Sequence, residues 1–100
     1  MKLNIRDIKH NITDVEKILK ALANKQRLFI LCHLLEGEQN AGELWKRSNL
    51  NQSAFSQHLS VLRRHQLVKI RKKAQTFYYS LADKKSVELL KVLHKFYCSP

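Results

Sequence analysis

Residues that interrupt regular secondary structure are almost absent from this chain. Its 100 residues contain two glycines and one proline, and that proline is the last residue. Glycine and proline mark most turns and loops, so a chain this poor in them favours helices joined by short connections. Apolar residues make up 44% of the chain, enough for one modest hydrophobic core. The sequence predicts a single, mainly helical domain over residues 1–100.

Positive charge is concentrated in the middle of the chain. The formal net charge is +11, and no aspartate or glutamate stands between Glu43 and Asp83. A region of one sign suits a polyanionic partner, whereas a solvated basic surface that serves solubility is the alternative. Both ends of the chain mix the two signs, which favours the polyanion. The cations of the interval are Lys46, Arg47, Arg63, Arg64, Lys69, Arg71, Lys72 and Lys73.

Hydrophobic spacing predicts five helices. They cover residues 8–22, 25–35, 41–48, 52–65 and 84–97, and Asn24, Asn40, Asn51 and Asp83 are in position to cap the last four. Asn40 with Glu43 resembles a capping box. The first helix carries one apolar stripe with coiled-coil spacing, which suits a second subunit or the chain's own core. The second helix is apolar on nearly all sides and is expected at the buried centre.

The hydrophobic period changes after the fourth helix. Val68 and Ile70 alternate with Lys69 and Arg71, and β-forming residues follow from Thr76 to Leu81. This pattern predicts two strands joined by a basic turn over residues 72–75.

Two short helices joined by residues 49–51, the second with a polar outer face, form a helix-turn-helix pattern. Serine, glutamine and histidine near the start of the second helix can donate and accept hydrogen bonds in a DNA major groove. A basic hairpin tip beside them suits the sugar-phosphate backbone. An ordinary amphipathic helix beside an ordinary hairpin is the alternative, and RNA binding lacks an aromatic stacking platform. The candidate DNA-binding residues are Gln52, Ser53, Ser56, Gln57, His58, Arg64, Arg71, Lys72, Lys73 and Gln75.

The stretch "LNQSAFSQHLSVLRRHQLV" resembles the recognition-helix signature of the ArsR family of winged-helix bacterial transcription regulators. The wider resemblance covers about two thirds of the chain and implies an α-α-α-α-β-β-α winged helix-turn-helix fold. It also implies a homodimer formed by the first and last helices. Gln66 stands where the family often has glycine, and a left-handed conformation there would cost roughly 1 kcal/mol. The expected interface residues are Ile8, Ile12, Val15, Leu19, Leu90, Leu93, Phe96 and Tyr97.

Both familiar metal sites of the family lack ligands here. Thiolate-binding members carry "ELCxCDL" in the third helix, and this chain reads "ELWKRS", with Trp45 and Arg47 at the cysteine positions. Of the zinc-site positions only Asp83 fits, because the other three hold Lys85, Phe96 and Ser99. The sequence therefore predicts neither a metal site nor a cofactor, although an unfamiliar site built from Cys32, Cys98 and His94 remains a rival.

The two cysteines are the remaining candidates for sensing. "ILC" in the second helix and "YC" at the end of the last resemble the persulfide-responsive, BigR/YgaV-like branch of the ArsR regulators and the HlyU-type virulence regulators. The resemblance implies that Cys32 and Cys98 lie near one another within a subunit. Oxidation by reactive sulfur species, with Cys32 inside and Cys98 at the ordered edge, is expected to weaken DNA binding.

Other classes of function fit less well. No acid, oxyanion loop or glycine-rich turn supports a Cys–His enzyme, so catalysis is not expected. A DNA-binding or anti-silencing virulence regulator with purely structural cysteines and a basic protein-interaction module are further rivals. Neither a transmembrane run nor an export signal is visible, so the expected location is the bacterial cytoplasm, at the nucleoid.

Overall fold

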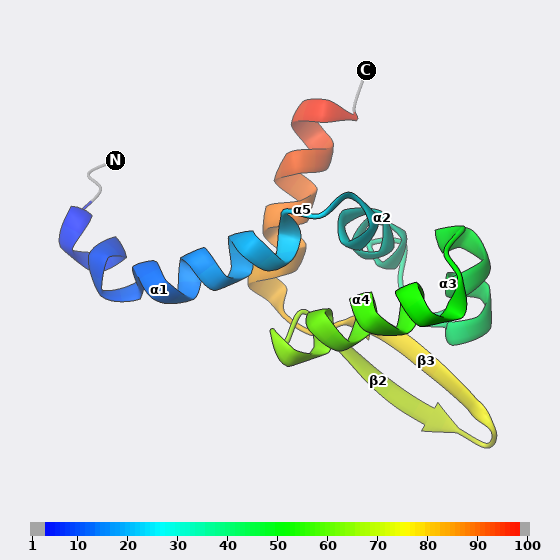
Figure 1. The fold of residues 1–100 in the computed structure, drawn as a ribbon. Helices are drawn as coiled ribbons and strands as arrows, with labels where there is room; N and C mark the ends of the chain where they lie inside the picture. The colour runs from blue at the N-terminus through cyan, green and yellow to red at the C-terminus, as the bar shows by residue number, and fades with distance from the viewer. Residues whose placement is uncertain (1–3, 99–100) are drawn as a thin grey trace.

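The computed structural model describes residues 4–98, which form five helices and three strands (Figure 1). The predicted winged helix-turn-helix order is confirmed, with one additional short strand before the third helix. The elements are α1 (Ile5–Leu22), α2 (Lys25–Leu34), β1 (Gln39–Asn40), α3 (Ala41–Ser48), α4 (Gln52–Arg64), β2 (Val68–Lys73), β3 (Thr76–Leu81) and α5 (Lys84–Tyr97).

Side-chain caps explain where the helices begin. The four predicted caps are confirmed, since each side chain accepts a hydrogen bond from a backbone N–H in the first turn of its helix. Asn4 does the same for α1, which therefore starts at Ile5 and not near Ile8 as predicted. In the expected capping box only one half forms, because the Glu43 carboxylate pairs with Lys46 at 3.7 Å.

The core lies where α2, α3, α4 and the sheet meet. Ile30, Leu31 and Leu34 from α2 are buried, but Phe29 on the same helix is 53% exposed and Cys32 is exposed. The predicted helix therefore contributes to the centre of the core, although one of its faces is open. The largest fully buried side chains are Ile30, Leu31, Leu44, Leu62, Leu67 and Leu90.

The three strands form an antiparallel sheet in the order β1-β3-β2. In the hairpin, Val68 pairs with Leu81 and Lys73 with Thr76. The turn is therefore shorter than predicted, with only Ala74 and Gln75 between the strands. β1 was not predicted because two residues carry no readable period, and its pairing with β3 joins the helix-turn-helix to the hairpin.

The end of α4 is the one place where the chain was expected to be strained. Gln66 has a φ of 59°, so it does adopt the left-handed conformation. The Leu67 N–H donates to Leu62 O and the Gln66 N–H to Arg63 O, each at 2.9 Å. This pair of bonds is the Schellman motif that usually holds glycine, so α4 ends as a glycine-capped helix would.

The terminal helices lie partly outside this core. In Figure 1 the N-terminal half of α1 extends away from the other elements, and the last turns of α5 project beyond α2. Leu90 anchors α5 in the core and is 2% exposed, so the prediction that it belongs to a subunit interface is wrong. Within residues 4–98, no helix combines the length and the hydropathy that crossing a membrane requires.

Candidate nucleic-acid interface and thiol pocket

The outer face of α4 is polar and open to solvent. Gln52, Ser53, Ser56 and Gln57 are exposed in its first two turns, and Arg64 is exposed at its end. They lie opposite the buried stripe of Phe55, Leu59 and Leu62. The helix thus offers short groups that donate and accept hydrogen bonds on one continuous face, as reading a major groove requires.

His58 differs from the other residues predicted on this face. It is half-buried, and desolvation, followed by the nearby Arg27 charge, lowers the pKa of its imidazole below the usual 6.5. The neutral form is therefore favoured near physiological pH. Its position toward α2 makes it the least accessible of the predicted base-reading side chains.

The turn before α4 is fixed by side chains of α3. The Trp45 indole Nε1–H donates to Leu50 O at 2.7 Å, and the Leu50 N–H donates to Ser48 Oγ at 3.2 Å. Asn49 adopts the left-handed conformation, with a φ of 58°. Trp45 thus ties α3 to the turn that precedes α4.

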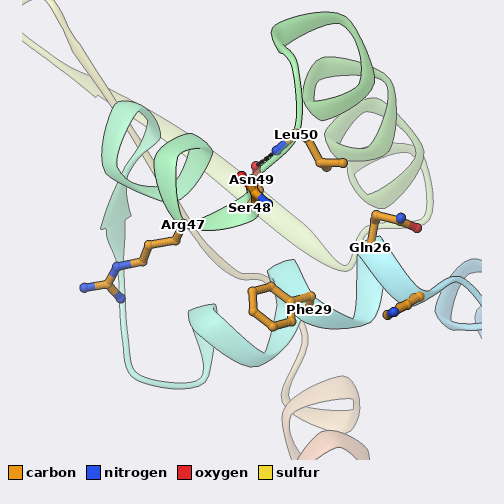
Figure 2. A pocket seen from close by; sticks show the side chains of 7 residues that line it. Gln26, Phe29, Arg47, Ser48, Asn49 and Leu50 are labelled. Carbon is orange, nitrogen blue, oxygen red and sulfur yellow. Dashed lines mark hydrogen bonds between the residues drawn. The ribbon is translucent and has the colours of Figure 1, made fainter.

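A shallow pocket lies between the start of α2 and this turn (Figure 2). Its walls include the exposed ring of Phe29 and the side chain of Leu50, and Figure 2 shows the Arg47 side chain pointing away from Phe29. Arg47 Nη1 instead donates to Glu36 Oε2 at 3.2 Å and to Gln39 Oε1 at 3.3 Å. None of the predicted DNA-binding residues lines this pocket.

The hairpin presents Lys72, Lys73 and Gln75 to solvent at its tip. Lys72 Nζ lies 5.4 Å from the centroid of the Phe77 ring, a contact that leaves its charge free. These side chains have the position and charge of contacts to a sugar-phosphate backbone.

Arg71 does not share this freedom. Its guanidinium crosses the Tyr78 ring at 4.5 Å and forms two hydrogen bonds with the Glu38 carboxylate, at 2.7 and 2.8 Å. The hydrogen bond from Arg71 holds the pKa of Glu38 below its usual range. Glu38 lies outside the acid-free interval of the sequence, and the fold returns it to the hairpin. The predicted phosphate contact of Arg71 is therefore already occupied by a carboxylate in this structure.

Cys32 lies on α2 where it faces α5, and Cys98 caps the end of α5. An open pocket between these helices is lined by Cys32, Leu35, Glu36, Lys91 and His94. Cys98 follows one turn after His94, and its backbone N–H donates to His94 O at 2.8 Å. Desolvation, and then the charge of Cys98, raises the pKa of the Cys32 thiol. This influence of Cys98 on the Cys32 thiol supports the implied proximity of the two thiols, which stays a prediction.

The expected placement of Cys32 inside the protein is wrong. Cys32 and Cys98 are both exposed, although the protein around Cys32 shields its sulfur enough to disfavour the thiolate. An oxidant can therefore reach either sulfur, and the raised pKa disfavours Cys32 as the first nucleophile.

The residues that could hold a metal ion do not gather. Within residues 4–98, no three histidine, cysteine, aspartate or glutamate side chains are close enough to bind one ion. Arg47 occupies one cysteine position of the thiolate-binding relatives and is held by Glu36. Ser99, at one of the zinc-site positions, lies outside the described residues.

Apolar side chains of α1 and α5 remain uncovered. Ile5 is 74% exposed, Phe96 73% and Tyr97 83%, far more than large apolar side chains on a monomer usually are. Ile12, Val15 and Leu19 line a mainly apolar groove along α1. Of the predicted interface residues, Ile8, Ile12, Leu19, Leu93, Phe96 and Tyr97 are exposed, and Val15 is half-buried.

Residues 24–69 match the family model described as bacterial regulatory protein, arsR family. The transcriptional activator HlyU of Vibrio cholerae is 45% identical over 96 residues, which cover 96% of this chain and 89% of HlyU. The structure of its reduced form has a TM-score of 0.87 and covers 94% of this chain and 99% of that one.

Two further solved structures are similar at lower identity. The transcriptional repressor BigR of Xylella fastidiosa is 31% identical with a TM-score of 0.89, over 98% of this chain and all of that one. A homodimeric winged helix-turn-helix DNA-binding domain from Mycobacterium bovis, a possible ArsR-family regulator, is 28% identical with a TM-score of 0.79, over 90% of this chain and 84% of that domain. These relatives are transcription regulators and not enzymes.

Proposed function

The chain belongs to the ArsR family of bacterial transcription regulators, and we propose that it binds operator DNA as a homodimer whose affinity falls when reactive sulfur species join Cys32 to Cys98. The observation that carries this proposal is the placement of the two thiols. One lies on a helix of the recognition core and the other at the end of a helix whose apolar face is uncovered. A covalent link between them would tie DNA recognition to subunit pairing.

DNA recognition is supported by the open polar face of α4 and the free lysines of the hairpin. In the proposed complex α4 enters the major groove, where Gln52, Ser53, Ser56 and Gln57 contact bases. Lys72 and Lys73, with Gln75 and Arg64, contact the backbone and supply affinity without sequence preference. His58, which is half-buried, is assigned to positioning the helix rather than to a base.

Homodimerisation is supported by the exposed apolar faces of α1 and α5. A dimer with twofold symmetry would bury them and place two copies of α4 in successive major grooves. The spacing between the two recognition helices then depends on how α5 of one subunit packs against its partner. A covalent change at Cys98, at the end of α5, would therefore affect the packing of α5 against the partner subunit.

The proposed reaction uses an organic persulfide as oxidant. One cysteine thiolate attacks the outer sulfur of the persulfide, RSSH, and RSH leaves, so the cysteine becomes a persulfide. The second thiolate attacks the inner sulfur of that group, expels HS⁻ and closes the bridge. The thiol pair loses two electrons and two protons, and the products are the bridged protein, RSH and H₂S. Each further RSSH adds one sulfur to the bridge and releases one more RSH.

The length of the bridge follows from the separation of the sulfurs. A plain disulfide needs Cα atoms about 4.4–6.8 Å apart, and every added sulfur extends the reach by about 2 Å. A pair held slightly beyond disulfide range would favour persulfides over ordinary disulfide oxidants. Selectivity for sulfur species would then result from distance and not from a binding pocket.

The test compares the reduced protein with protein treated with glutathione persulfide. Intact mass spectrometry identifies the bridge, and fluorescence anisotropy at fixed salt measures affinity for an operator selected from random DNA. We expect one bridge per subunit and a loss of operator affinity of roughly tenfold or more, a coupling typical of allosteric regulators. Equal affinity of the reduced and bridged forms would overturn the sensing proposal and leave a DNA-binding regulator with structural cysteines.

Serine variants provide the controls. Cys32→Ser and Cys98→Ser should each bind the operator like the reduced protein and show no response to persulfide, because neither can close the bridge. A full response in either variant would refute the two-thiol mechanism. One equivalent of zinc retained through gel filtration would instead favour the metal-responsive rival.

A further inference from the structure

The segment between α2 and α3 links the helix that carries Cys32 to α3 and to the hairpin. Residues Glu36–Gln39, here called the linker, begin one turn after Cys32, enter β1 at Gln39 and lead to α3. Their side chains contact α3 and the hairpin, and their backbone is bonded to the last turn of α2. Nothing in the regular pattern of the sequence marks this segment as important.

The backbone of the linker is attached to the residues around Cys32. The N–H groups of Leu35, Glu36 and Gly37 donate to the carbonyls of Cys32, His33 and Leu34, at 3.1–3.3 Å. His33 O also accepts a hydrogen bond from Gln39 Nε2. A displacement of the Cys32 turn therefore moves the linker, because the bonds run from one directly to the other.

The first carboxylate of the linker faces both the pocket at Cys32 and the helix-turn-helix. Glu36 lines the same pocket as Cys32, Lys91 and His94. Its Oε2 also accepts a hydrogen bond at 3.2 Å from Arg47, near the end of α3. Drawing α5 toward α2 would bring Lys91 and His94 closer to Glu36, where they compete with Arg47 for the carboxylate.

The second carboxylate holds the hairpin. Glu38 forms the two-bond pair with Arg71, which reaches it across the face of Tyr78. The bidentate geometry fixes orientation as well as distance, so the linker sets the direction in which β2 and its lysine-bearing tip project. One short segment thus constrains the hairpin directly and, through Arg47, the helix α3 that precedes the recognition helix.

We propose that Glu36 and Glu38 are positioning residues that transmit the state of the thiol pair to α3 and to the hairpin through Arg47 and Arg71. This inference rests on the proposed sulfur response and names its route. Forming the bridge moves the last turn of α2 and with it the linker. The two ion pairs then change together, and the recognition helix and the hairpin no longer match one DNA site.

The test uses the double variant Glu36→Gln with Glu38→Gln. Each substitution keeps the shape of the side chain and removes the charge that holds its arginine. The control is Glu43→Gln, which makes the same change on α3 to a carboxylate that pairs within its own helix, with Lys46 at 3.7 Å. The readout is the ratio of operator affinities of the reduced and bridged forms, with bridge formation verified by intact mass.

We expect the double variant to form the bridge like the wild type. Its ratio of operator affinities, reduced form to bridged form, should fall to one fifth of the wild-type ratio or less, whereas Glu43→Gln should keep the wild-type ratio. Loss of a merely structural contact would lower the affinity of both forms and leave their ratio unchanged. The single variants provide the same test if the double variant does not fold.

The outcomes separate this inference from the function on which it rests. A wild-type response together with an unchanged ratio in the double variant would overturn the route through the linker and leave the sulfur response intact. Equal affinities of the two wild-type forms would overturn both. A loss of the ratio in Glu43→Gln as well would show that charge near the DNA matters rather than the linker, and this too would refute the proposal.

Discussion

The recognition unit, from α2 to β3, and the terminal helices α1 and α5 use similar apolar side chains in opposite ways. In the recognition unit Leu31, Leu44 and Leu62 are fully buried, so the unit provides its own core. On the terminal helices the apolar residues beyond Leu22 and Leu90 are mostly exposed. The difference indicates that the recognition unit is stabilised from within, whereas the terminal helices depend on a partner surface.

The largest effect on stability is expected from truncating a side chain in the core of the recognition unit. Leu62→Ala removes a fully buried side chain from α4 and should lower the free energy of unfolding by about 2–5 kcal/mol. Leu19→Ala, measured at a concentration that keeps the chain monomeric, should change it by less than about 0.5 kcal/mol. Urea denaturation of the two variants measures both values. Equal losses would show that α1 belongs to the core of the single chain.

The second prediction tests the partner surface. Leu19→Glu places a charge in the apolar groove of α1 and should abolish dimerisation, with a roughly 100-fold loss of affinity for a palindromic operator because the two half-sites are no longer bound together. Sedimentation equilibrium and anisotropy measure the two effects. Thr13→Glu adds the same charge at an exposed position on the same helix and should leave both unchanged. A Leu19→Glu dimer that still binds its operator would contradict the proposed interface.

The third prediction distinguishes the lysines that are proposed to contact phosphate from Arg71, whose charge is already paired. Lys72→Gln and Lys73→Gln should each reduce the slope of log affinity against log salt concentration by about 0.9, because each loses one phosphate contact. Arg71→Gln should leave that slope unchanged and lower the melting temperature, since its charge is paired with Glu38. Binding titrations at several salt concentrations provide the slopes. A reduced slope for Arg71→Gln would mean that DNA displaces Glu38.

The fourth prediction concerns the strained end of α4. Gln66→Gly should stabilise the protein by roughly 0.5–1 kcal/mol, because glycine adopts the left-handed conformation without the steric cost that glutamine bears. Glycine also loses more backbone entropy on folding, so the gain stays below the full strain. Gln75→Gly, in the turn but without a positive φ, is the matched control and should not stabilise. Thermal unfolding of the two variants measures both changes in stability, and equal changes would contradict the prediction.

The smallest effect is expected at His58. Desolvation lowers its folded-state pKa below 6.5, so the unfolded chain binds the proton first as the pH falls. The associated stability is complete above about pH 6.5 and is lost as the pH drops through the lower folded-state pKa. Urea midpoints at about pH 7.5 and 5.5 should therefore differ less in His58→Gln than in the wild type. An identical pH dependence in both proteins would show that desolvation does not lower the pKa of His58.

Most of the fold could be predicted from local signals. Asparagine and aspartate caps, hydrophobic periods and the change of period at Val68 located four helix starts and both long strands, because these signals act within one or two turns of chain. The start of α1 was missed although the signal was present, because Ile5 precedes Ile8 by three residues and Asn4 stands in the capping position. β1 exists only through its pairing with β3.

The candidate sites show the same difference: features that depend on nearby residues could be predicted, and contacts between distant segments could not. Spacing alone placed the polar residues of α4 on one face, and the absence of acids between Glu43 and Asp83 located the basic hairpin. Sequence could not reveal that Glu38 returns to pair with Arg71, because 33 positions separate them and only the sheet brings them together. Nor could it show that Cys32 is exposed. On a helix with apolar residues on most sides, exposure depends on which other elements pack against it.

By itself, therefore, the sequence determined the order of the elements, the polar face of the recognition helix and the positions of two thiols along the chain. The tertiary structure decided which cation remains free for a phosphate, which apolar side chains are covered, and that Cys32 opens into a pocket between α2 and α5. The physical reason is range. Capping and hydrophobic periodicity act between neighbours along the chain, whereas ion pairs, burial and thiol pairing depend on segments that meet only after folding.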